Sequence, residues 1–300
     1  MQGVLAASAR YSLFGRGSSI KIGIFSLKIS GNSDNFNFSW NPSRIELMIM
    51  KLQKPFYRIA RPGATMHSDY ILDGRYASDR FMLLQSFQLI ENDLKRILEF
   101  VEPTDSNVSV YSHRIYELFL RCATEFETNC KKILSANGYH SQKSLNIGDY
   151  YRINVATNLS EYEVKINIWH PSAQVFKPLG DWAAGSSLGW YQDYNCVKHD
   201  RFVNFDKASL NNVLYAAGSL ISLLFAQFDE YAFSPYSDET MSTQQDDAGF
   251  WYGINSLFNV NPFTAWSVDE SYGFDWKSIN SSLNPYQQYS FLPHIREGER

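Results

Sequence analysis

The feature that most constrains the fold is an apolar run that begins near Asp206 and ends at Phe228. Its large apolar residues recur at helical spacing and Asp206 is a typical N-cap residue, so the run predicts one long helix. Ser219, Ser222 and Gln227 interrupt the run, which also falls short of the roughly 20 apolar residues that a membrane span needs. We therefore predict a helix buried in the centre of a helical bundle, and no membrane association.

Two further segments carry the same helical pattern. Apolar residues recur every three or four positions from Asp79 to Val101, and Pro103 closes the segment. A second pattern runs from Val110 to Ala136, and the Asn-Gly pair at 137–138 is a typical helix stop. Together with a helix that begins at Trp190, these segments predict a bundle of four helices.

Residues 150–169 and 231–300 depart from the helical pattern. In the first segment apolar residues alternate with polar ones, which predicts a β-hairpin inserted between helices. The second segment is acidic and rich in large aromatic rings, which are seldom left in water, so we expect it to pack on the bundle or on a protein partner. The predicted fold is mainly α, with a helical domain over 48–230, the inserted hairpin, and an irregular aromatic C-terminal extension.

The start of the chain has its own composition. Residues 1–33 are rich in serine and contain four basic side chains and no acidic ones. This composition is typical of an organellar transit segment, but also of a poorly structured extension ahead of a working domain. Met48 and Met50 precede the first predicted elements and favour the second interpretation, so we predict that residues 1–47 are poorly structured.

Net charge and cysteine content exclude several classes of protein. The net charge of −4 argues against a non-specific nucleic-acid binder with a broad basic face, but it leaves room for a local site. The three cysteines are odd in number, and Cys122 and Cys130 lie in a helical apolar pattern, so we expect no disulfide framework. A reducing compartment fits this usage, and we predict a cytoplasmic protein. No motif for a metal ion or a cofactor is present, and none is predicted.

The densest group of chemically able side chains lies in residues 190–201. Read as a helix, this segment places Lys198 and Arg201 on one stripe, and Asn195 and His199 one turn apart on the adjacent stripe. Because an imidazole can both accept and donate a proton near neutral pH, His199 is the candidate general acid or base. Asn195 can orient this imidazole or a phosphate, and Lys198 and Arg201 can hold a phosphate.

These roles fit the cleavage of RNA by its own 2′-hydroxyl, which needs proton transfer and charge stabilisation but no metal. Arg121 and Glu125, on the charged face of the helix over 110–136, are placed to contribute to the same pocket from across the bundle. The same residue types also cap helices and hydrogen-bond buried polar groups, and the sequence leaves both interpretations open.

The segment from Asn195 to His199, with the long helix from Asp206 after it, resembles the HEPN superfamily. That family is a four-helix bundle whose signature is Arg, four to six residues and then His, commonly with a polar residue such as Asn directly after the Arg. His199 matches the signature His, and Asn195 matches the polar position.

The sequence departs from this signature at the arginine. Gln192, Asp193 and Tyr194 stand where the family has Arg, and none of them is basic. Lys198 and Arg201 are the nearest cations that can substitute for it.

The resemblance covers about residues 76–230 and has consequences for function. It implies an RNA-binding protein, and specifically a metal-independent endoribonuclease of a defence or toxin-antitoxin system. Active members dimerise so that two signatures form one composite site, which implies a homodimer. Other members are inactive binding or scaffold modules, so the alternative is a non-catalytic helical module that docks a protein partner through residues 231–300.

Overall fold

A computed structural model describes residues 51–65, 69–141, 144–239 and 243–291. By its internal contacts the chain divides into two units, Met1–Leu47 and Met48–Arg300, and every described residue belongs to the second. The extension predicted over residues 1–47 therefore lies outside the described residues. The described part is mainly helical with one small antiparallel sheet, which confirms the mainly α class.

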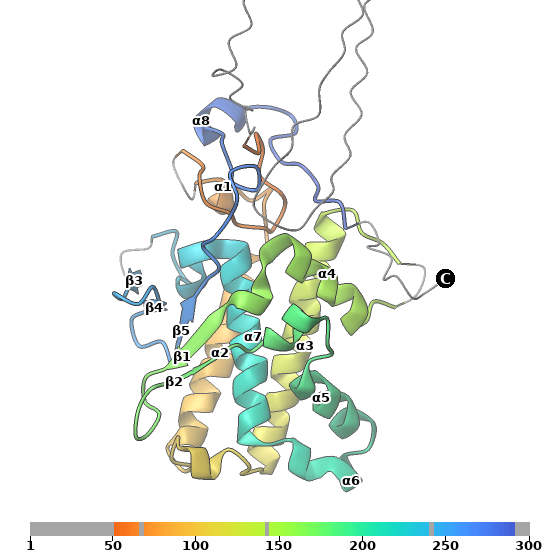
Figure 1. Ribbon diagram of the computed structural model, residues 1–300, viewed down its shortest axis with the longest axis vertical. Helices are drawn as coiled ribbons and strands as arrows, with labels where there is room; N and C mark the ends of the chain where they lie inside the picture. The colour runs from red at the N-terminus through yellow and green to blue at the C-terminus, as the bar shows by residue number, and fades with distance from the viewer. Residues whose placement is uncertain (1–50, 66–68, 142–143, 240–242, 292–300) are drawn as a thin grey trace, which may run out of the picture. The chain divides into compact units, whose positions relative to one another are not determined.

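Helix α7, Leu210–Phe228, is the centre of the bundle. Helices α2 (Arg80–Leu98), α3 (His113–Ala136) and α5 (Gly189–His199) pack against it, and α2 and α5 each pack against α3 as well. Figure 1 shows α7 and α3 between α2 on one side and α5 on the other. By length and composition alone, Leu210–Phe233 can span a membrane, but 89% of its most apolar window is buried inside the fold, as in a core helix.

Local capping side chains set the ends of these helices. Ser112 starts α3 by accepting a hydrogen bond from the amide of Ile115 at 3.2 Å, and Gly138, with φ at 75°, follows its end. The start predicted for α7 at Asp206 is wrong by about one turn, because the N-cap is Ser209. Asp206 lies instead in the 3₁₀ turn Phe205–Lys207 that precedes this cap.

The predicted hairpin over 150–169 is wrong in its first half, which is helix α4, Ile147–Thr157. Asn146 and Asp149 form a reciprocal capping box that starts a helix, and the apolar residues after it turn to the core at helical spacing. The other short helical segments are α1 (Asp69–Leu72), α6 (Arg201–Asn204), α8 (Trp276–Ile279) and the 3₁₀ turns Asp105–Asn107, Leu159–Glu161, Gly180–Ala184 and Asp229–Phe233.

The second half of that segment is strand β1, Glu163–Ile166, which belongs to a five-stranded sheet in the order β2-β1-β5-β4-β3. All neighbouring strands are antiparallel, and Val164 of β1 lies opposite Val260 of β5. Because β5 lies beyond residue 230, the C-terminal extension pairs with the rest of the fold and is not irregular throughout. The other strands are β2 (Gln174–Phe176), β3 (Thr243–Gln245), β4 (Trp251–Gly253) and β5 (Phe258–Asn261).

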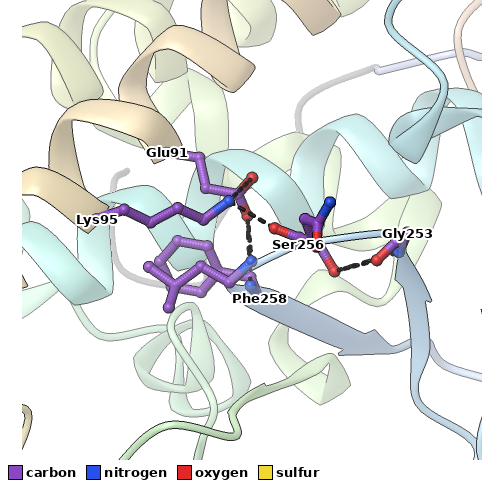
Figure 2. A network of polar contacts seen from close by, with 7 residues as sticks. Glu91, Lys95, Gly253, Ser256 and Phe258 are labelled. Carbon is purple, nitrogen blue, oxygen red and sulfur yellow. Dashed lines mark hydrogen bonds and ion pairs between the residues drawn. The ribbon is translucent and has the colours of Figure 1, made fainter.

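A buried carboxylate joins this extension to the bundle (Figure 2). Glu91 of α2 is 7% exposed, and its Oε1 accepts hydrogen bonds from the backbone amides of Leu257 at 2.6 Å and Phe258 at 3.4 Å. Its Oε2 lies 3.3 Å from the Lys95 Nζ, which also donates to the carbonyl oxygen of Asn255 at 2.5 Å. One acidic residue in α2 therefore holds the start of β5 in place.

The first described residues pack against the end of the extension. Isolated β-bridges join Leu52 to Tyr272 and Thr65 to Asp275, and the Tyr272 ring is buried. Arg58 enters the bundle itself, where it ion-pairs with Asp79 ahead of α2 and donates to Gln227 in α7. The two ends of the described chain thus belong to the same packed structure as the helices.

Candidate functional site

The helix predicted to carry the site ends at His199, and a new helix begins at Arg201. Asp200 lies between them with φ −144° and ψ 82°, and its Oδ1 accepts a hydrogen bond from the amide of Val203 at 3.2 Å. Asp200 is therefore the N-cap of α6. The prediction that Lys198 and Arg201 share one continuous helical stripe is wrong, because this cap turns the chain between them.

Asn195 and His199 still lie one turn apart on α5, but the structure does not join them. His199 is exposed, and within the part of the chain that the structure describes no hydrogen bond, ion pair or ring contact involves its side chain. Asn195 is half-buried. The imidazole is thus open to solvent rather than held inside the bundle.

Lys198 is anchored to its own helix. Its Nζ lies 5.1 Å from the centre of the Tyr194 ring, and the hydrogen bond to Tyr194 raises the pKa of Lys198 above its ordinary value. The Tyr194 ring is buried and contacts the Phe119 ring of α3, with ring centres 6.1 Å apart. Lys198 is therefore a cation at neutral pH that is supported on a fixed aromatic base.

Arg201 contacts a group of rings that the sequence analysis did not connect with this site. Its guanidinium carbon lies 5.2 Å from the centre of the Tyr116 ring in α3. The Phe205 ring, which follows α6, contacts three rings in and just before the first turn of α3. Its ring centre lies 5.5 Å from that of Tyr111, 4.9 Å from that of His113 and 5.9 Å from that of Tyr116. A second exposed imidazole therefore lies at this end of the bundle.

We call this set of residues the α5–α6 surface. The chain brings its two halves together by non-local contacts, because Tyr111 forms a β-bridge with Ser209 and Val110 accepts a backbone hydrogen bond from Leu210 at 2.8 Å. The spacing of His113 and Tyr116 in the sequence places them one turn apart on α3, on the same face of the helix. No local sequence pattern indicates that this face contacts α6. The surface consists of Tyr111, His113, Tyr116, Lys198, His199, Arg201 and Phe205.

Arg121 and Glu125 do not join this surface. The Arg121 guanidinium lies 2.5 Å from the Asp93 carboxylate of α2, so it faces the opposite neighbour of α3. The face of α3 that meets α5 carries Glu127, whose carboxylate accepts a hydrogen bond from the Tyr191 hydroxyl at 2.9 Å. Glu125 is half-buried one turn from Arg121, and burial raises its pKa above the ordinary value.

No protein-family model, no curated protein and no solved structure matches this chain. Within the described ranges no cluster of three or more His, Cys, Asp or Glu side chains is placed to hold a metal ion. What the α5–α6 surface does offer is flat rings, fixed cations and two exposed imidazoles, a combination that can stack a base, hold a phosphate and transfer a proton.

Proposed function

We propose that this chain is an HEPN-like protein that binds single-stranded RNA on the α5–α6 surface and cleaves it without a metal ion. The observation that carries the proposal is the contact of Arg201 with the Tyr116 ring and of His113 with the Phe205 ring, two rings that contact each other. The exposed His199 lies two residues before Arg201. Proteins that bind single strands combine cations along the backbone with rings on which bases stack. Helices α2, α3, α5 and α7 pack on one another, and this arrangement is compatible with the four-helix bundle of that family.

The missing signature arginine has a structural explanation in this chain. Asp193 accepts a hydrogen bond from the Asn212 side chain at 2.9 Å and lies 3.5 Å from Lys207, so it ties α5 to the start of α7. Tyr194 is buried against α3. In the proposed site Arg201 supplies the guanidinium instead, because it is exposed and two residues from the imidazole.

The proposed reaction uses the substrate's own nucleophile. His199 takes the proton of a ribose 2′-hydroxyl, the 2′-oxygen bonds to the adjacent phosphorus, and the bond from phosphorus to the 5′-oxygen breaks. The leaving 5′-oxygen takes up a proton from the second imidazole or from water, which leaves a 2′,3′-cyclic phosphate and a 5′-hydroxyl. Lys198 and Arg201 stabilise the charge that develops on the phosphate oxygens.

The test is binding and cleavage of RNA by the full-length protein in the presence of EDTA. We expect single strands to bind better than duplexes, Arg201→Ala to weaken binding, and His199→Ala to abolish cleavage while binding persists. His140→Ala, at another exposed histidine, is the matched control and should behave like the wild type. Equal cleavage by His199→Ala and the wild type refutes the catalytic role, and no binding of any RNA at low salt refutes the proposal as a whole.

The alternative, a non-catalytic module that docks a partner through residues 231–300, has less support. Several large rings of that segment belong to the chain's own core, since Tyr272, Phe274 and Trp276 are each no more than 4% exposed. The homodimer implied by the resemblance remains part of the proposal, and sedimentation of the purified protein tests it. A monomer that still cleaves RNA would remove the composite site from the proposal.

A further inference from the structure

A groove between α2 and α3 lies next to the α5–α6 surface and encloses about 680 Å³. Its apolar wall includes Ile97 and Leu118, and the Phe100 side chain beside them is 88% exposed. Three arginines complete the lining, namely Arg96, Arg114 and Arg121. We call this feature the α2–α3 groove.

The charges of the groove favour an anion. Arg96 and Arg121 share a single carboxylate, that of Asp93, at 3.1 Å and 2.5 Å, and Arg114 lies 2.9 Å from Glu117. Three cations therefore face two anions in a chain whose net charge is −4. Each guanidinium has five N–H donors, so one carboxylate leaves donors for a phosphate, and Asp93 holds two of the guanidinium groups close together.

The groove and the α5–α6 surface meet at four consecutive residues. Ser112 is extended, with φ −160° and ψ 169°, so its side chain points away from its neighbours Tyr111 and His113. Helix α3 begins at His113, so Arg114 lies about 100° around the helix axis from His113. Tyr111 and His113 contact the Phe205 ring, whereas Ser112 and Arg114 line the groove. Residues 111–114 are thus a narrow ridge between the two sites.

We propose that an RNA strand bound on the α5–α6 surface crosses this ridge and continues into the α2–α3 groove. There Phe100 stacks a base, and Arg96, Arg114 and Arg121 contact successive phosphates. This inference rests on the proposed function. Two features of the groove favour RNA over a peptide as its ligand. The arginines form a cationic row that starts at the edge of the α5–α6 surface, and an exposed ring beside cations can stack an unpaired base.

The experiment measures binding of fluorescent RNA single strands of about 4 and about 12 nucleotides, lengths within the usual range of single-strand sites. It compares the full-length wild type with Arg96→Gln/Arg114→Gln/Arg121→Gln at several salt concentrations. Each lost phosphate contact lowers the salt slope by about 0.7, so the triple variant should lose about 2 from the slope for the longer strand. We expect at least a tenfold loss of affinity for that strand and no change for the shorter one.

The matched control removes the same charge elsewhere, with Arg75→Gln, Lys177→Gln and Lys277→Gln at exposed positions outside both sites. It should leave the difference between the two strand lengths intact. If the triple variant fails to fold, Phe100→Ala replaces it, because that ring is almost wholly exposed and should still weaken only the longer strand.

Three outcomes overturn the inference, and they differ in whether they also overturn the proposed function. If the wild type binds both strand lengths equally, or if the triple variant binds the longer strand as well as the wild type does, the groove is not part of the RNA path and the proposed function still stands. Either result is also expected if the groove binds an acidic peptide. Failure of both strand lengths to bind the wild type overturns the proposed function together with the inference.

Discussion

Replacing Glu91 by alanine should destabilise the fold by releasing the C-terminal extension from α2. The carboxylate accepts from the amide of Leu257 at 2.6 Å in a site that is 7% exposed, so its loss leaves a buried donor without its partner. A hydrogen bond to a charged group contributes about 1.5–3 kcal/mol. The longer contact to Phe258, at 3.4 Å, and the pair with the partly exposed Lys95 together add about 1 kcal/mol at most.

The expected loss for Glu91→Ala is therefore about 2–4 kcal/mol in the free energy of unfolding, or roughly 4–16 °C in the midpoint of thermal unfolding. Glu91→Gln keeps an oxygen that accepts from Leu257 but loses the charge, so it should cost about half as much. Urea unfolding of the full-length protein, followed by circular dichroism, measures both values.

The control is Glu99→Ala, because Glu99 is an exposed acid just beyond the end of the same helix and should change stability by about 0.5 kcal/mol or less. Amide hydrogen exchange then localises the effect, since Leu257 and Phe258 should lose protection before the amides of α7 do. If Glu91→Ala unfolds at the same urea concentration as Glu99→Ala, the carboxylate does not hold the extension.

Three further predictions test the core. Burial acts to raise the pKa of Asp79, but hydrogen bonds from Lys132 and Arg58 lower this pKa below its ordinary value, so the carboxylate stabilises the fold fully above about pH 4 and less as pH falls through the lowered pKa. Asp79→Asn should therefore cost about 1–2 kcal/mol of unfolding free energy at pH 7 and should make acid unfolding less steep. Burial raises the pKa of Cys122 to about 12 and also raises the pKa of Cys130, so neither thiol forms the reactive thiolate at pH 8. Iodoacetamide at pH 8 should therefore label only the half-buried Cys196, which mass spectrometry measures. Gly63→Ala should cost about 2–4 kcal/mol in urea unfolding, because φ is 102° and the new Cβ overlaps the carbonyl oxygen of Tyr272.

The helices were predictable from the sequence because what starts and ends them is local. The pattern from Asp79 to Val101 became α2 directly after Asp79, and the pattern that ends at Ala136 became α3. The error over 150–157 arose where two local patterns compete. Alternation of apolar residues suggested a strand, but the capping box of Asn146 and Asp149 starts a helix that buries the same segment.

The sheet was not predictable from local patterns. β1 pairs with β5, and Val164 lies opposite Val260. Helices α5, α6 and α7 and strands β2, β3 and β4 all lie between these two residues in the sequence. Nothing within either strand specifies the other, because strand pairing is decided by which faces the folded core leaves to be covered. The aromatic composition of residues 231–300 indicated burial, but it did not indicate a partner strand.

The α5–α6 surface depends on Asp200, a residue whose capping role was not predicted from the sequence. Read as part of a continuous helix, Arg201 belongs on the stripe of Lys198, but Asp200 caps α6 and turns the chain, so the Arg201 guanidinium lies over the Tyr116 ring of α3. The same turn leaves His199 as the last residue of α5, open to solvent. In the proposed site the absence of the signature arginine and the presence of this cap are connected, because the cap is what moves a nearby arginine to the substrate surface.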